Sequence, residues 1–73
     1  MRGREFIDRV KEFAKQRGIE FSFDETRGKD SHGTIWLGNR CTVLPDARKE
    51  LKKGTLAAMC RQLGISPQDL RGR

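Results

Sequence analysis

The chain has few of the residue types on which metal and redox sites depend. Among its 73 residues are one histidine, His32, and two cysteines, Cys41 and Cys60. It contains no Cys-x-x-Cys pair, and a single histidine does not complete a usual zinc ligand set. Residues 27–73 carry only four acids, well separated along the sequence: Asp30, Asp46, Glu50 and Asp69. Because a metal-dependent nuclease needs clustered carboxylates, we expect no metal and no cofactor.

Long apolar runs are also missing. No stretch approaches the roughly 20 apolar residues of a membrane-spanning helix, and the N-terminus leads into an amphipathic pattern, not a signal peptide. We therefore expect a cytoplasmic protein without membrane association, folded as a single domain over residues 1–73. In that reducing compartment a structural disulfide is disfavoured, and both cysteines, which have apolar residues nearby in the sequence, are expected to act as small hydrophobes.

The net charge of +6 is unevenly distributed along the sequence. Residues 1–26 carry six basic and six acidic side chains and are neutral, whereas residues 27–73 carry ten basic side chains against four acids. A surface of this charge attracts polyanions, and nucleic acid is the commonest polyanion in cytoplasm. The alternative is a solvated face that only keeps the protein soluble.

Apolar spacing predicts a helix at each end of the chain. The first helix carries Phe6, Ile7, Val10, Phe13 and Ala14 and stops at Gly18; the second carries Leu56, Met59, Cys60 and Leu63 and stops at Gly64. Ser66, Pro67 and Asp69 then predict a short capped helix. Between the two long helices, apolar and polar residues alternate over 19–24, which predicts a half-buried strand followed by a loop over 25–32.

Residues 33–37 and 40–44 predict a hairpin around Gly38-Asn39, a type II′ sequence. The turn pairs Leu37 with Arg40, Trp36 with Cys41 and Ile35 with Thr42. One face of the hairpin then holds Trp36, Cys41 and Val43, and the other holds Ile35, Leu37 and Leu44. The sequence leaves open which face is buried; we favour the second, with Trp36 on the open side. The element order predicts a two-layer α+β fold, α-β-β-β-α, with a three-stranded antiparallel sheet and two helices on one face.

His32 lies in a loop with basic neighbours, Arg27 and Lys29, and a second basic pair, Lys52 and Lys53, leads into the later helix at Gly54. Free N–H groups at a helix start bind phosphate well. These cations are therefore expected to hold a phosphodiester backbone beside His32. The layout is that of the double-stranded-RNA-binding domain, which uses a loop after its first strand and a lysine pair at its second helix. His32 itself suits a catalyst, a phosphate contact or an ordinary surface residue.

Two stretches, "GKDSHGTIWLGNRCTVLP" and "LKKGTLAAMCRQLGIS", resemble the HicA toxins of bacterial toxin–antitoxin systems. The shared features are a Gly-x-x-Ser-His loop, a short hairpin ending in proline, and Lys-Gly-Thr-Leu opening a helix that ends in Leu-Gly-Ile. The resemblance runs from Arg27 to Ser66. It implies a double-stranded-RNA-binding-like fold, endoribonuclease activity on mRNA and a HicB-type antitoxin partner. The catalytic histidine of the family falls on His32, and the flanking positions match Gly28, Ser31, Gly54 and Thr55.

Asp30 departs from the family pattern, because HicA loops often carry glycine immediately before the Ser-His pair. An acid at that position brings negative charge to a phosphate site, so it puts efficient cleavage in doubt. Two other functions stay open. One is a non-enzymatic RNA-binding module in which His32 only contacts phosphate. The other is a helix-turn-helix DNA reader formed by residues 55–71, although few residues remain for its recognition helix.

Overall fold

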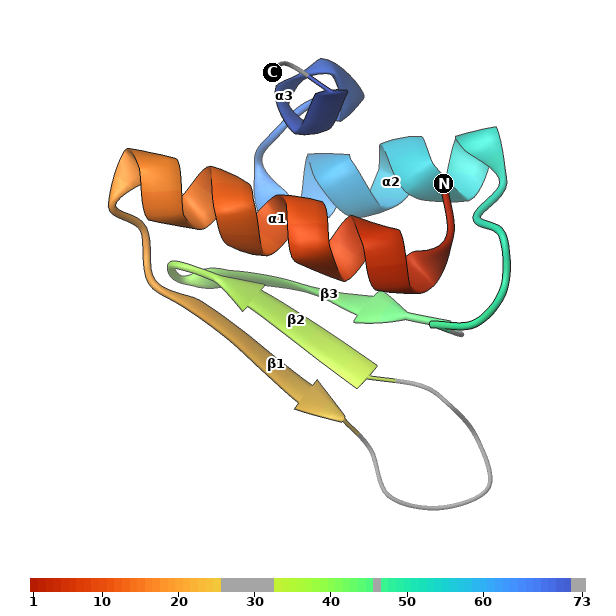
Figure 1. The fold of residues 1–73 in the computed structure, drawn as a ribbon, viewed down its shortest axis with the longest axis horizontal. Coiled ribbons are helices and arrows are strands. Elements are labelled where there is room, and N and C mark those ends of the chain that lie inside the picture. Colours follow the sequence, from red (N-terminus) through yellow and green to blue (C-terminus); the bar gives the residue numbers. More distant parts are fainter. Residues whose placement is uncertain (26–32, 46, 72–73) are drawn as a thin grey trace.

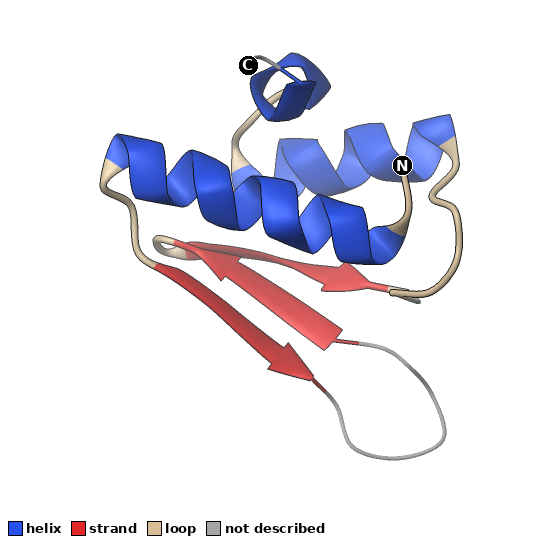
Figure 2. Ribbon diagram, viewed as in Figure 1, coloured by secondary structure: helices blue, strands red, loops and turns tan. Residues whose placement is uncertain are grey.

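The computed structural model describes residues 1–25, 33–45 and 47–71 (Figure 1). Its elements, in chain order, are α1 (Gly3–Arg17), β1 (Phe21–Glu25), β2 (Gly33–Leu37), β3 (Arg40–Leu44), α2 (Lys53–Leu63) and α3 (Pro67–Arg71). Figure 2 shows the sheet as one layer with the helices on one side of it. The predicted α+β class is confirmed, with α3 added beyond the two covering helices. None of the helices in these ranges has the length and apolar character needed to cross a bilayer.

The sheet is antiparallel in the order β1-β2-β3. The predicted hairpin register is confirmed, because Leu37 pairs with Arg40, Trp36 with Cys41 and Ile35 with Thr42. Gly38 has a φ of 65°, and no described non-glycine residue has a positive φ. A positive φ at the first central residue alone is the pattern of a type II′ turn. The first strand is shifted from its prediction: it begins at Phe21 and continues through Glu25.

Alternation along β2 and β3 sends one set of side chains toward the helices and the other away from them. Ile35, Leu37 and Leu44 are buried, whereas Trp36 is 42% exposed and Val43 56% exposed. The favoured orientation of the hairpin is therefore confirmed. Cys60 is buried, whereas Cys41 is exposed, as the favoured orientation of the hairpin implies. Its pairing with Trp36 puts it on the side of the sheet that no described helix covers.

The core fills the space between the sheet and the two long helices, which lie over it side by side (Figure 1). α1 packs against β1 and β2, and α2 packs against β3. The largest fully buried side chains are Phe6, Ile35, Leu44, Val10 and Cys60. Burying an apolar side chain of this size contributes about 1.5–3 kcal/mol. The apolar residues whose spacing predicted the two helices are thus the residues that these helices contribute to the core.

Both predicted helix stops are confirmed. Gly18 and Gly64 adopt left-handed φ values of 67° and 77° and close the last turns of α1 and α2. The predicted cap of α3 is present as well, because the Ser66 N–H donates to the Asp69 carboxylate at 2.9 Å. α3 packs on α1 and α2 rather than on the sheet; Leu70 is buried, and the Arg9 guanidinium donates to its carbonyl at 3.0 Å.

Gly33 opens β2 beneath the ring of Phe23. A Cβ at Gly33 would lie 2.6 Å from that ring, so we expect Gly33→Ala to overpack the core. Such overpacking costs typically 1–3 kcal/mol, which outweighs the roughly 0.4–1 kcal/mol that alanine gains by restricting the unfolded chain. Urea unfolding measures the reduced stability. In a Phe23→Leu background the cost of Gly33→Ala should fall; costs that simply add would show that the ring is not the cause.

Candidate nucleic-acid interface

The first residues of the chain are fixed against the segment that connects β3 to α2. The N–H groups of Gly3 and Arg4 donate to the carbonyls of Lys49 (3.0 Å) and Ala47 (2.8 Å), and the Leu51 N–H donates to the Met1 carbonyl (2.9 Å). Arg2 and Glu50 form an antiparallel bridge between these hydrogen bonds. The Glu50 carboxylate also accepts from the terminal ammonium of Met1. Two segments far apart in the sequence thereby become neighbours.

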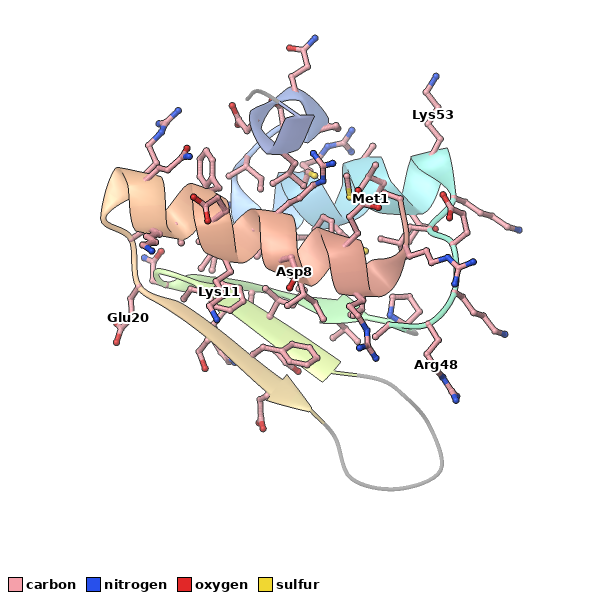
Figure 3. The ribbon with its side chains drawn as sticks, viewed as in Figure 1. Met1, Asp8, Lys11, Glu20, Arg48 and Lys53 are labelled. Atoms are coloured by element: carbon pink, nitrogen blue, oxygen red, sulfur yellow. The ribbon has the colours of Figure 1, made fainter. Side chains whose placement is uncertain are left out.

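This contact gathers basic side chains at one end of the molecule. Figure 3 shows Arg48 and Lys53 extending from the end at which Met1 lies. We call this surface the basic end and define it by six exposed residues: Arg2, Arg4, Arg48, Lys49, Lys52 and Lys53. Among the described residues of the same segment, the acid is Glu50, and it is already bonded to the terminal ammonium. The basic end is therefore a concentrated positive surface.

Both long helices begin at the basic end (Figure 1), and their first turns differ. In α1, the N–H groups of Gly3 and Arg4 are occupied by the carbonyls of Lys49 and Ala47. In α2 no side chain caps the helix and no acid lies in its first turn. Within the described ranges, no protein acceptor receives the N–H groups of Lys53, Gly54 and Thr55. Among the described residues, nothing pairs with these donors or with the positive end of the α2 dipole.

A hollow of about 270 Å³ lies between the end of β3 and the first turn of α2. It is lined by Pro45, Lys49, Glu50, Leu51, Lys52 and Thr55. Its apolar wall comes from Pro45 and Leu51, while Lys49 and Lys52 also belong to the basic end. A ligand carrying a phosphate would meet a concave surface and two ammonium groups there, together with the Glu50 carboxylate.

The structure brings together four of the residues that the sequence assigned to the site. Lys52 is the N-cap of α2, and Lys53, Gly54 and Thr55 form its first turn, as predicted. Five further site residues lie outside the described residues: Arg27, Gly28, Lys29, Ser31 and His32. Asp30 is among the residues not described as well.

Arg2 and Arg4 belong to the basic end, although they were not predicted to be site residues. Acids and bases are equal in number over residues 1–26, so that part of the sequence is neutral. Glu5 lies in the same first turn of α1 but is paired with Arg9 at 2.9 Å, whereas Arg2 and Arg4 lie beside residues 47–50. No local sequence pattern predicts that Arg2 and Arg4 join the basic end, because their position there depends on contact with a segment distant in the sequence.

The helix-turn-helix alternative finds no support in the geometry. α3, which would have to be the recognition helix, has five residues, and its Leu70 is buried in the core. The Arg9 guanidinium further ties its backbone to α1. A recognition helix must instead present a free face to the major groove. Among the described residues, no group of three or more His, Cys, Asp or Glu side chains could hold a metal ion.

Comparison with models of protein families, with curated proteins and with solved structures gives no match for this chain. The resemblance to HicA toxins therefore stands on the sequence motifs quoted above.

The two cysteines differ in environment, so we expect them to differ in reactivity. Burial raises the pKa of the Cys60 thiol above 9.0, and the nearby Asp69 carboxylate adds to this. A thiol reagent at pH 8 should label Cys41 at once and Cys60 only after unfolding, because the thiolate is the reactive form. Cys41→Ser should remove the fast phase. Fast labelling that persists in Cys41→Ser would contradict the buried position of Cys60.

The basic end predicts that Arg2 and Arg4 contribute to polyanion binding as much as the lysine pair does. Replacing both arginines by alanine should weaken binding of a single-stranded RNA and flatten its salt dependence. The log–log slope should fall by about 0.7 for each phosphate that the protein no longer neutralises. Lys52→Ala with Lys53→Ala should do the same for every RNA sequence.

The matched control is Lys11→Ala with Lys15→Ala, since these exposed lysines lie further along α1. Binding should be measured by fluorescence anisotropy between 50 and 300 mM salt, a range of roughly this width being enough to define a slope. If the arginine pair behaves like this control pair, Arg2 and Arg4 do not contact phosphate.

Proposed function

We propose that this chain is an RNA-cleaving toxin of the HicA type, which holds the RNA backbone at the basic end and uses His32 as the catalytic base. The observation that carries the binding part is the convergence of six exposed cations with the uncapped start of α2. Backbone contacts of this kind position a nucleic acid without reading its sequence. The grip is therefore tolerant of RNA sequence.

The arrangement of helices and strands supports this proposal. A three-stranded antiparallel sheet carries α1 and α2 on one face, and the lysine pair stands at the start of α2. The double-stranded-RNA-binding domain has the same order of elements and grips phosphates with its second helix. We propose that the fold is of this kind.

The cleavage chemistry follows from the residues that the sequence offers. His32 is the only side chain whose unperturbed pKa lies near neutral pH. It would take the proton from a ribose 2′-hydroxyl, whose oxygen then attacks the adjacent phosphorus. The bond from phosphorus to the 5′-oxygen breaks, which leaves a 2′,3′-cyclic phosphate and a 5′-hydroxyl protonated by water or a lysine. Lys29, Lys52 or Lys53 would stabilise the charge on the phosphoryl oxygens.

The partners that we propose are mRNA and a HicB-type antitoxin protein. A free ribonuclease is harmful to its own cell, so an inhibitor is needed, and the basic end suits an acidic inhibitor surface by electrostatic complementarity. The competing function is a non-enzymatic RNA-binding module. It would use the same basic end, so binding alone does not separate the two functions.

Cleavage by the purified chain separates them. His32→Ala should keep the circular dichroism spectrum of the wild type and lose RNA cleavage, because a positioned general base contributes typically about 10²–10⁴-fold. Wild-type cleavage should continue in EDTA and should leave a 2′,3′-cyclic phosphate.

The control substrate carries one 2′-O-methyl ribose at the cut site, and it should resist cleavage at that bond while binding normally. Full activity of a folded His32→Ala variant would remove His32 from the mechanism. A strict requirement for magnesium, or cutting at the blocked bond, would refute attack by the 2′-hydroxyl.

A further inference from the structure

The face of the sheet turned away from the helices has a composition unlike the rest of the surface (Figure 2). We call it the open face. Strand alternation and register place six side chains on it: Ser22, Asp24, Thr34, Trp36, Cys41 and Val43. Glu20, which precedes β1, continues the row of Ser22 and Asp24. Figure 3 shows Glu20 pointing away from the helices. None of these seven residues is basic, although the chain carries sixteen lysines and arginines.

One half of the open face is apolar. Trp36 pairs with Cys41 across β2 and β3, and Val43 lies diagonally beside them. Trp36 is 42% exposed on the central strand and Val43 is 56% exposed on β3. An exposed tryptophan beside further apolar side chains is the type of residue that anchors protein interfaces. A single apolar side chain on a surface needs no explanation, whereas a cross-strand group of three calls for one.

The other half is acidic. Asp24 is exposed on β1, and Glu20 is exposed just before that strand. An RNA phosphate brought to this face would meet carboxylates without a compensating cation among its residues. The open face and the basic end therefore suit ligands of opposite charge.

A second copy of the chain fits this face poorly. Trp36 and Val43 together expose on the order of 200 Å² of apolar surface, if a buried tryptophan is taken as about 250 Å². Stable interfaces bury about 800 Å² on each partner. Two open faces packed together would have to extend over the β1 rows, where Glu20 and Asp24 of one copy repel those of the other. The occupant must instead bring positive charge to these acids.

We propose that the open face binds a segment of another protein in which apolar side chains that cover Trp36 and Val43 are flanked by lysine or arginine facing Glu20 and Asp24. This site lies on the side of the sheet opposite the helices, and so opposite the start of α2, and it does not depend on RNA cleavage. A partner held here leaves the basic end available to RNA or to an acidic inhibitor.

The test begins with a displayed library of random peptides, about a dozen residues long, selected on the full chain and counter-selected on Trp36→Ser. The selected sequences should combine apolar residues with lysine or arginine. Trp36 is the only tryptophan in the chain, so its emission reports directly on the open face. A synthetic peptide of the selected sequence should shift that emission to shorter wavelength as it binds.

Variants then test each half of the face. Val43→Ser should weaken binding of the peptide about tenfold or more, as truncation of an anchoring side chain does. Asp24→Lys should weaken it and reduce its salt dependence, whereas Asp8→Lys, the same change at an exposed position of α1, should leave it unchanged. Circular dichroism checks that each variant is folded. If Trp36→Ser does not fold, Val43→Lys takes its place as the variant used for counter-selection.

Three outcomes would overturn the proposal. The first is a selected sequence that is acidic, or whose binding survives the removal of Trp36. The second is an RNA oligonucleotide that shifts the emission of Trp36 and competes with the peptide, which would make the open face a nucleic-acid surface. The third is a dimer at micromolar concentration, seen by sedimentation and abolished by Trp36→Ser, which would make the occupant a second copy.

Discussion

The contact between the first four residues and residues 47–51 is the constraint on which the arrangement of the molecule depends. Three backbone hydrogen bonds and the bridge between Arg2 and Glu50 hold it together. It fixes the start of α1 beside the segment that leads into α2, so the two helices begin at the same end of the sheet. The core then needs only the apolar stripes of the two helices to face the strands below. Without this contact, the arginines of the N-terminus and the lysines before α2 would have no fixed relation.

The same contact places like charges close together. Exposed charges are screened by water and salt, so each pair repels only weakly, but six cations on one small surface add up. Backbone hydrogen bonds, which do not depend on the side chains, hold the segments together against this repulsion. A bound polyanion removes the repulsion and stabilises the folded chain by mass action. The fold and the function proposed for it are therefore coupled through the basic end.

Local patterns predicted the local structure. Gly18 and Gly64 marked the helix ends, and Gly38-Asn39 fixed the strand register, because each depends only on neighbouring residues. Features that depend on distant contacts escaped prediction. Arg2 and Arg4 join the basic end only through residues 47–50. The lysine pair was found from sequence because it directly precedes its own helix, whereas the role of His32 stays a prediction.

The parallel course of α1 and α2 has a consequence for how the molecule meets its ligand. Their dipoles point the same way, so the positive ends add to the cations around them. At the C-terminal ends, Lys15 and Arg17 lie in the last turn of α1 and Arg61 lies in the last turn of α2, where their positive charges offset the negative ends of the dipoles. The positive potential of the molecule is therefore strongest at the basic end. A polyanion some distance away exerts a torque on such a molecule, which turns the basic end forward before contact and raises the rate of productive encounters at low ionic strength.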